Sequence, residues 1–455
     1  MTRTVLLSLI ASTMIMAGGD IVPAEPVVAE VEADWGEIFG QSRTFYIDRT
    51  YTSGPASHTV GNRNSLATGG YIGYKSPEFN GFTAVVAAYG TYGFDIHSQD
   101  ADVVGSASYD PSLYGDDFDN YAFIGQAYIN YAFGNTNIKV GRQRLDTPLA
   151  GADDARMLPN LFEAAVLSNK DVENTTLIAA HVHSMTTGTF SNVYGAPGQL
   201  SLQSGYGLGY KLGTSGDFAE MGDIALGDGT NTNGVTALAA IYTGVEGLKL
   251  QAWDYIAWDI LNAVYLQADY GWNCLLSDSV KMKASAQYIN ESEIGDSLAG
   301  NVDVNYFGIK LATTIDAFSA YAAYSTTGED TNTVTNGGVI TPWGGMPAFT
   351  QGMVTRHMFF ADTDTWKVAA TYKFADLGLK ASAYYVEFDI GQSNTYQPGE
   401  AWTATESGFD IQYDVAAVKG LNLRLRANYP RDFAPDTGKG ATDWDEYRLI
   451  ANYNF

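Results

Sequence analysis

The stretch LNLRLRANY, residues 421–429, alternates apolar and polar side chains without interruption. Leucines, an alanine and a tyrosine occupy the odd positions, whereas asparagines and arginines occupy the even ones. Successive side chains of a β-strand point to opposite faces, so this period of two predicts a strand with one apolar and one polar face. Its length of about 10 residues suits a tilted bilayer-crossing strand, with lipid on one side and water on the other.

The same alternation returns in neighbouring segments. In the final segment the apolar residues from Tyr447 to Phe455 share one parity, and the polar residues from Glu446 to Asn454 share the other. Aromatic residues gather near the segment ends, as they do in the interfacial girdles of outer-membrane barrels.

Eighteen segments of this kind follow residue 40. Most span about 10 to 13 residues, longer than a typical soluble strand. Their expected bounds are 41–51, 66–76, 80–93, 121–133, 136–144, 161–170, 174–184, 234–244, 247–256, 260–271, 279–290, 302–313, 317–327, 364–374, 377–388, 405–415, 420–430 and 444–455.

Short and long links alternate between these segments. The short links include 134–135, 171–173, 245–246, 314–316 and 375–376. The long links include 94–120, 145–160, 185–233, 328–363 and 431–443. This order predicts an all-β fold, an 18-stranded antiparallel transmembrane β-barrel with short periplasmic turns and long extracellular loops. The run GYGLGY at 205–210 would make a nineteenth strand, and we place it inside a long loop.

The alternative to a membrane barrel is a soluble β-sandwich, propeller or secreted β-domain. The regular division of each segment into an apolar and a polar face argues against it.

Composition excludes several classes of protein. Acids outnumber bases 51 to 25 in the 455 residues, a net charge of −26, which argues against nucleic acid as a partner. Hydrophobic residues make up 45%, too many for a disordered chain. The single cysteine, Cys274, excludes a disulfide framework.

The N-terminus has the pattern of an export signal. Arg3 precedes a mostly apolar run over 5–17, which is too short for a membrane-spanning helix. We expect a signal peptide over 1–17, with cleavage as late as Ala29, then an acidic segment over 18–40 and one barrel domain over 41–455.

Two stretches resemble the OprD family of outer-membrane porins. The run from Gly141 to Pro148, continued by DDARMLPNLFE at 153–163, resembles that family's third-loop region. The run WGGMPAFT at 343–350, with the strands that follow it, resembles the seventh loop and the C-terminal strands. The resemblance covers the mature chain and implies an 18-stranded barrel in a Gram-negative outer membrane. It also implies diffusion of small solutes, often carboxylates or amino acids, through a pore narrowed by infolded loops and lined by basic side chains.

The resemblance makes 145–160 the pore-constricting loop 3 and 328–363 loop 7. Loop 3 carries charges of both signs, which would form a transverse field at the constriction, and a solvated loop tied by ion pairs is the alternative. The constriction residues that we expect are Arg142, Arg144, Asp146, Asp153, Asp154 and Arg156.

Charges in the second half of the barrel are expected to face the lumen, because a lipid-facing Lys or Arg at the midplane costs roughly 2–4 kcal/mol. The expected inward cations are Lys249, Lys281, Lys283, Lys367, Lys373, Lys380, Arg424, Arg426 and Arg448. The expected inward acids are Asp269, Asp303, Glu406, Asp410, Asp414 and Glu446. Five charges break parity near segment ends: Asp254, Lys310, Asp364, Glu387 and Asp445. Polar lining of any water-filled barrel is the alternative to a basic track that guides anions.

The remaining candidate residues do not form a recognisable metal-binding or catalytic site. The run Asp110, Asp116, Asp117 and Asp119 lacks the spacing of an EF-hand and reads as a solvated loop. His181 and His183 are more typical of lumen lining than of a metal pair. The chain has no G-x-S-x-G or H-E-x-x-H motif, so we expect no enzyme, no cofactor and no metal.

The sequence therefore predicts a passive, moderately selective porin for small hydrophilic solutes. Its expected surroundings are outer-membrane lipid and lipopolysaccharide, without nucleic acid, and a homotrimer and a monomer are both open. The alternative function is a structural or adhesive surface protein that works through its long acidic loops.

Overall fold

The computed structural model describes residues 35–53, 61–94, 96, 110–115, 119–190, 215–275, 277–435 and 443–455. The expected signal peptide and the run at 205–210 lie outside these residues. The wall strands are β1 (Glu37–Ser53), β2 (Gly61–Lys75), β3 (Phe82–Phe94), β4 (Tyr121–Phe133), β5 (Thr136–Gln143), β6 (Leu161–Asn169), β7 (Thr175–Thr186), β9 (Val235–Val245), β10 (Leu248–Ala257), β11 (Leu261–Cys274), β12 (Ser277–Glu293), β13 (Asp303–Ile315), β14 (Phe318–Thr327), β15 (Thr363–Phe374), β16 (Leu379–Ile390), β17 (Trp402–Asp414), β18 (Leu421–Arg431) and β19 (Asp443–Asn454).

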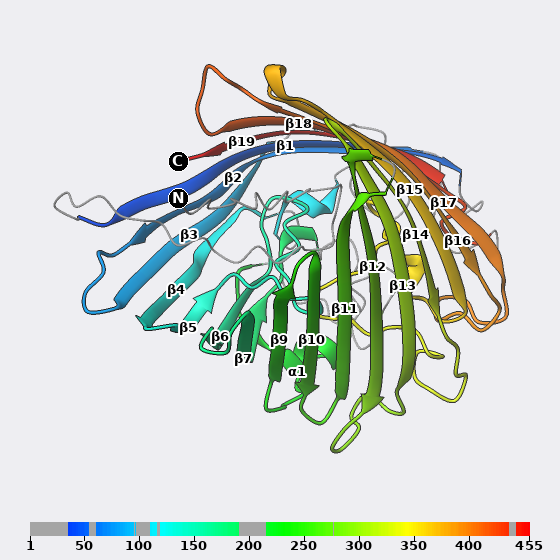
Figure 1. The fold of residues 1–455 in the computed structure, drawn as a ribbon, viewed down its shortest axis with the longest axis horizontal. Helices are drawn as coiled ribbons and strands as arrows, with labels where there is room; N and C mark the ends of the chain where they lie inside the picture. The colour runs from blue at the N-terminus through cyan, green and yellow to red at the C-terminus, as the bar shows by residue number, and fades with distance from the viewer. Residues whose placement is uncertain are drawn as a thin grey trace.

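These strands form one closed antiparallel barrel (Figure 1). The first strand pairs with β2 on one side and with β19 on the other. Gly40 and Phe455 exchange backbone hydrogen bonds of 2.9 and 3.1 Å, which brings the two ends of the barrel together. The predicted 18-stranded antiparallel barrel is confirmed.

The short elements are not part of the barrel wall. The two-residue strand β8 (Ala219–Glu220) pairs with the end of β7, but β7 also pairs directly with β9, so β8 belongs to the intervening loop. It continues into the helix α1 (Met221–Leu226). The 3-10 turns are η1 (Pro111–Leu113), η4 (His357–Phe359) and η5 (Ala375–Leu377). Among the described residues no helix is long and apolar enough to cross a membrane.

Strand bounds differ from the expected ones mainly where strands continue beyond the apolar alternation. The first strand begins at Glu37 rather than at 41, and β12 runs over Ser277–Glu293 rather than 279–290. Backbone pairing continues in water, whereas the apolar face ends with the membrane, so alternation underestimates strand length.

The two rims differ in the lengths of their connections. Short turns lie at the rim that carries Gly40 and Phe455, and longer loops lie at the other. One connection at the long-loop rim departs from the expected alternation: only 258–260 join β10 to β11. Asp259 adopts a left-handed conformation there, with φ of 63°, which aspartate tolerates better than most residues.

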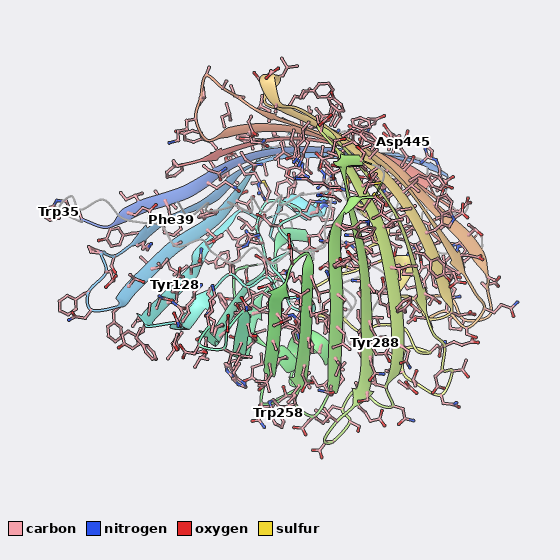
Figure 2. All side chains as sticks on the ribbon, in the orientation of Figure 1. Trp35, Phe39, Tyr128, Trp258, Tyr288 and Asp445 are labelled. Atoms are coloured by element: carbon pink, nitrogen blue, oxygen red, sulfur yellow. The ribbon has the colours of Figure 1, made fainter. Side chains whose placement is uncertain are left out.

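The outer face is apolar and carries aromatic residues near both rims. Trp35 lies near the end with the termini, and Trp258 and Tyr288 lie toward the opposite end (Figure 2). Ile309 and Leu449, farther from the rims, are exposed on the same outer face. This is the arrangement of interfacial girdles flanking a lipid-facing band.

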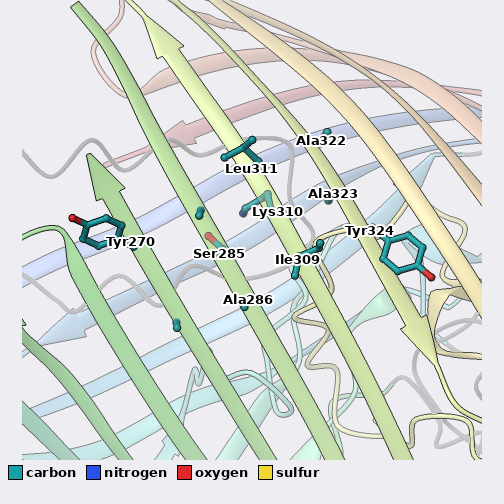
Figure 3. A pocket seen from close by; sticks show the side chains of 11 residues that line it. Tyr270, Ser285, Ala286, Ile309, Lys310, Leu311, Ala322, Ala323 and Tyr324 are labelled. Atoms are coloured by element: carbon teal, nitrogen blue, oxygen red, sulfur yellow. The ribbon is translucent and has the colours of Figure 1, made fainter. Parts of the chain in front are cut away.

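An apolar groove of about 620 Å³ marks the outer wall over β11 to β14 (Figure 3). Ala284, Ala286 and Ala322 lie in it, and Tyr270 and Tyr324 stand on either side. Because these residues have outward parity, the groove faces lipid and lies outside the solute path.

Candidate pore constriction

Two long loops fold into the lumen and cross each other there. Loop 3 comprises residues 144–160, and loop 7 comprises residues 328–362. The Gly151 N–H donates to the Trp343 carbonyl at 3.0 Å, and Ala150 forms isolated bridges to Trp343 and Gly344. The two loops are therefore joined to each other through their backbones.

Polar side chains of the inner wall anchor loop 7. Gln287 of β12 donates to the Pro347 carbonyl at 2.7 Å and accepts the Phe349 N–H at 3.0 Å. Glu291 accepts the Ile340 N–H at 2.8 Å. These contacts satisfy backbone groups that would otherwise be buried without partners.

Glu406 of β17 provides the densest anchor of loop 7. Its carboxylate accepts the N–H groups of Met353 at 2.6 Å and of Thr355 at 2.7 Å, and also that of Val354. The Tyr384 hydroxyl donates to it as well. Glu406 points inward, as predicted. Its carboxylate holds loop 7 against the barrel wall.

Loop 3 is held by a chain of ion pairs that begins on β1. Arg43 lies 2.6 Å from the Asp154 carboxylate, Asp154 lies 3.2 Å from Arg144, and Arg144 lies 3.0 Å from Asp146. Burial would raise the pKa of Asp154, but the charges of Arg43 and Arg144 outweigh it and hold that pKa at about 2. Asp154 is therefore an anion at any physiological pH.

A second ion pair joins loop 3 to loop 7. Two guanidinium nitrogens of Arg356 each lie 3.1 Å from one oxygen of Asp153. Arg356 is fully buried, so the pair is screened little by solvent.

Two arginines of β18 pair with an aspartate of the neighbouring strand. The Arg424 guanidinium donates to Asp410 of β17 at 2.9 Å through Nε, and Arg426 lies 3.3 Å from the same carboxylate. The Arg424 side chain stays 27% exposed, so it retains access to the lumen.

A cavity of about 230 Å³ lies between these groups. Its charged lining is Arg144, Asp146, Asp153, Asp154, Arg424 and Arg426. Four of the six residues expected in the constriction and two of the expected basic ladder therefore meet around one small space.

Arg142 and Arg156 do not line this cavity. Arg142 has the outward parity of the exposed Val140, stacks 4.3 Å over the Phe218 ring and pairs with Glu163 at 3.7 Å. Arg156 is fully buried, 3.0 Å from the Ser112 hydroxyl and 3.3 Å from Glu446, and burial lowers its pKa to about 10.

The expected basic ladder divides into three groups. Lys367 and Arg448 are buried: Lys367 donates to the Gln351 carbonyl of loop 7, and Arg448 pairs with Glu446. Arg424 and Arg426 line the cavity. The remaining lysines lie near the rim with the short turns, on the inner parity of their strands, and they are Lys249, Lys281, Lys283, Lys373 and Lys380.

Two predicted directions on β13 are wrong. Lys310 shares the inner face with the buried Tyr306, and its ammonium lies 4.3 Å over the Phe349 ring of loop 7. Asp303 shares the outer face with the exposed Ile309. The alternation assigns the apolar residues of this strand to the lipid face. Its inner face packs on loop 7 and is itself largely apolar, so the two faces are exchanged.

The expected lumen position of His181 is also wrong. His181 stands opposite Thr236 on the face that carries the exposed Leu238, and its Nδ1 lies 3.0 Å from the Thr236 hydroxyl. His183 lies at a bulge in β7 and is exposed. Among the described residues no group of three His, Cys, Asp or Glu could hold a metal.

Asp110 is not a solvated loop residue. It is fully buried, accepts the Ser112 N–H at 3.0 Å and lies 3.4 Å from Arg49. Asp116 and Asp117 lie outside the described residues.

Sequence reasoning missed three arginines. Arg43 and Arg49 lie on the inner face of β1 and bind Asp154 and Glu446, and Arg356 binds Asp153. The alternation of β1 would have placed the first two toward lipid, because they share parity with Phe45 and Ile47. No periodic signal marks Arg356, which lies in an irregular loop.

A closed 18-stranded barrel with an apolar outer belt and a cavity of charged side chains inside it defines an outer-membrane porin. A protein-family model described as outer membrane porin, OprD family, matches residues 36–455 of the chain. The chain belongs to the OprD family, and it is a passive diffusion porin of a Gram-negative outer membrane. A search of curated proteins found no match.

Solved structures with the same fold are distant in sequence. OccAB3 of Acinetobacter baumannii has a TM-score of 0.73 at 18% identity, over 93% of this chain and 100% of that one. OccK9 (OpdG) of Pseudomonas aeruginosa has a TM-score of 0.71 at 20% identity, over 92% and 98%. OpdK of the same organism, solved with vanillate, has a TM-score of 0.69 at 17% identity, over 92% and 98%.

Proposed function

We propose that the constriction between loop 3 and β18 selects small hydrophilic solutes that carry a carboxylate. The observation that carries this proposal is the partly exposed Arg424 guanidinium, which shares a 230 Å³ cavity with carboxylates of loop 3. A guanidinium can bind a carboxylate through two parallel hydrogen bonds, which gives geometric selectivity as well as attraction.

The opposed charges create a field across the pore. Asp146, Asp153 and Asp154 belong to loop 3, and Arg424 and Arg426 belong to the facing strand β18. A solute with separated charges or a strong dipole is oriented by such a field, whereas an apolar solute of equal size gains nothing from it.

The proposal draws support from two relatives. OpdK was solved with vanillate, and OccK2 (OpdF) of Pseudomonas aeruginosa was solved in complex with glucuronate. Both ligands carry a carboxylate, which is the group that this proposal assigns to Arg424.

Reversal potentials in a salt gradient across planar bilayers test the selectivity. Replacing Arg424 and Arg426 with glutamine should shift the reversal potential toward cation preference. Arg431 points outward and pairs with Asp445 at 2.6 Å. The control is Arg431→Gln, which should leave the reversal potential unchanged. Strong cation selectivity in the native chain that persists unchanged in the double variant would contradict the proposal.

Liposome swelling tests the solute class. Small carboxylates should enter faster than neutral sugars of similar size, and the Arg424→Gln variant should lose most of that difference. Equal entry of both classes into liposomes with the native chain would show an unselective pore.

A further inference from the structure

We propose that the inner wall where β19, β1 and β2 meet holds a subsite for neutral sugars, which it binds by their ring faces. Four residues form the subsite: Phe39, Gln41, Tyr71 and Asn454. The inference rests on the lumen being the solute path of the proposed function. It adds an uncharged class of solute, held by residues other than the charged groups of the constriction.

The strand register places the polar and aromatic members of this wall side by side. Asn454 of β19 is the direct partner of Gln41 of β1, which is the direct partner of Tyr71 of β2. Tyr71 pairs in turn with Tyr89 of β3. Each of these residues has the inward parity of its strand. Neighbouring strands lie roughly 4.8 Å apart, so the row spans about 14 Å of the inner wall.

Aromatic rings form the surface of one half of this row. The Tyr71 and Tyr89 rings are stacked with their centroids 4.9 Å apart, and the Phe39 ring meets the Tyr71 ring edge-on at 6.2 Å. A Cβ atom on Gly73 would lie 2.5 Å from the Phe39 ring, so that ring lies over the bare backbone of Gly73. Ala87, on the same inner face, is only 1% exposed. The half-buried Tyr71 and Phe39 rings, rather than the wall beneath them, are therefore what a solute meets.

Amides beside the rings supply hydrogen bonds without charge. The Gln41 amide donates to the Asn454 side-chain oxygen at 2.9 Å, in a contact that is open to solvent. A primary amide has two donor hydrogens and an oxygen with two lone pairs, so this bond leaves both side chains able to bind hydroxyl groups. Aromatic rings next to amides suit a sugar, because its ring carries C–H groups on its faces and hydroxyls around its edge.

The subsite lies directly below loop 3 on the periplasmic side. Arg43, which holds Asp154 of loop 3, is the next inward residue of β1 above Gln41. The charges of Arg43 and Asp154 act on the Tyr71 hydroxyl, so Tyr71 is close to this anchor. Phe39 lies nearer the rim that carries the termini (Figure 2). A solute that leaves the charged cavity toward the periplasm therefore meets Tyr71 first and Phe39 next.

Liposome swelling with glucose and sorbitol tests the subsite. The two solutes have nearly the same mass, but sorbitol is an open chain and has no ring face. Glucose should enter liposomes that contain the native chain about threefold faster than sorbitol, which is the size of effect that one aromatic ring contact gives. Equal rates for the two solutes would overturn the subsite before any substitution is made.

Substitutions identify the residues responsible. Tyr71→Leu should make the two rates equal, whereas Tyr71→Phe keeps the ring and should keep the difference. Gln41→Leu removes the amide and should reduce the difference, and it carries the test if Tyr71→Leu fails to form a barrel. Tyr372→Leu removes an exposed ring from the outer face of β15 and is the control. A difference that persists unchanged in both Tyr71→Leu and Gln41→Leu would overturn the subsite.

Arg424→Gln separates this subsite from the proposed selection of carboxylates. It should slow the entry of carboxylates and leave the ratio of glucose to sorbitol unchanged, whereas Tyr71→Leu should do the reverse. Loss of both preferences in Tyr71→Leu would show that the tyrosine acts through the constriction, and would overturn a separate sugar subsite. Carboxylates that enter no faster than sugars through the native chain would contradict the proposed function, and the ratio of glucose to sorbitol would still decide the subsite.

Discussion

Gly345 of loop 7 lies directly against the backbone of Leu149 in loop 3. A Cβ atom at Gly345 would come within 2.2 Å of the Leu149 carbonyl carbon and 2.4 Å of its Cα. Backbone atoms cannot move aside as the end of a flexible side chain can, so only glycine permits this crossing of the two loops.

Replacing Gly345 with alanine should therefore separate loops 3 and 7 and change the single-channel conductance, by about twofold or more, without preventing barrel assembly. Gly328→Ala is the matched control in the same loop, because its Cβ would meet no atom closer than 3.5 Å. Conductance in Gly345→Ala equal to that of the control would show that the crossing does not set the pore width.

Removing the charge of Glu406 should loosen loop 7. Glutamine offers one carbonyl oxygen to the three backbone N–H groups and the Tyr384 hydroxyl that the carboxylate now accepts. Each hydrogen bond to a charged group contributes roughly 1.5–3 kcal/mol. We expect faster amide hydrogen exchange at 353–355 and noisier currents. Glu387→Gln, on the outer face, should leave both unchanged.

Glu446 should matter far more for stability than its neighbour Asp445. Glu446 lies fully buried between Arg49 at 2.8 Å, Arg156 at 3.3 Å and Arg448. Glu446→Gln leaves buried guanidiniums uncompensated, which costs about 3–5 kcal/mol of unfolding free energy. Asp445→Asn breaks an outward pair with the partly exposed Arg431 and should cost less than about 1 kcal/mol. Urea unfolding followed by electrophoretic mobility measures both.

Acid should weaken the contact between loop 7 and the segment after β18. The His357 ring is fully buried, stacks at 4.4 Å on Phe360, and its Nε2 lies 2.7 Å from the Phe433 carbonyl oxygen. Burial lowers the pKa of His357 from 6.5 to about 4. Stabilisation by the neutral ring is thus complete above pH 6.5 and lost as the pH falls toward 4, by roughly 3 kcal/mol in total.

Proteolysis of loop 7 between pH 7 and 4.5 measures this loss. Cleavage should become faster as the pH falls, and His357→Gln should remove the dependence. A native chain with the same cleavage rate at both pH values would contradict the role given to this histidine.

The charge of Asp154 should not titrate in the working range. With a pKa held at about 2, its ion pairs with Arg43 and Arg144 are present above the usual aspartate range and lost only as the pH falls through about 2. Ion selectivity should therefore be flat between pH 7 and 5, and Asp154→Asn should shift the reversal potential at both. Selectivity that changes between these pH values in the native chain and not in Asp154→Asn would show a higher pKa.

Alternation in the sequence was enough to predict the barrel because each strand separates lipid from the lumen. It failed on β13, where loop 7 replaces water at the inner face and Val304, Tyr306 and Ala312 are buried there. Parity distinguishes two faces, but it does not say which of two apolar faces meets lipid.

The site was predictable only in part for a related reason. The charged run of loop 3 identified Arg144, Asp146, Asp153 and Asp154 as a group. Their partners lie far away in sequence: Arg43 is 111 residues from Asp154, and Arg356 is 203 residues from Asp153. Contacts between an irregular loop and a distant strand leave no periodic pattern, so the sequence alone could not pair them.

The joining of β1 to β19 also limits how this chain can be made. Gly40 and Phe455 are bonded to each other although 414 residues separate them in the chain. Until the last strand is present, β1 keeps an open edge of unpaired backbone groups, which attracts other strands and cannot be exposed to hydrocarbon. Synthesis must therefore be complete before the wall closes, and a chain that stops before β19 would remain an open sheet that other machinery of the cell must hold or degrade.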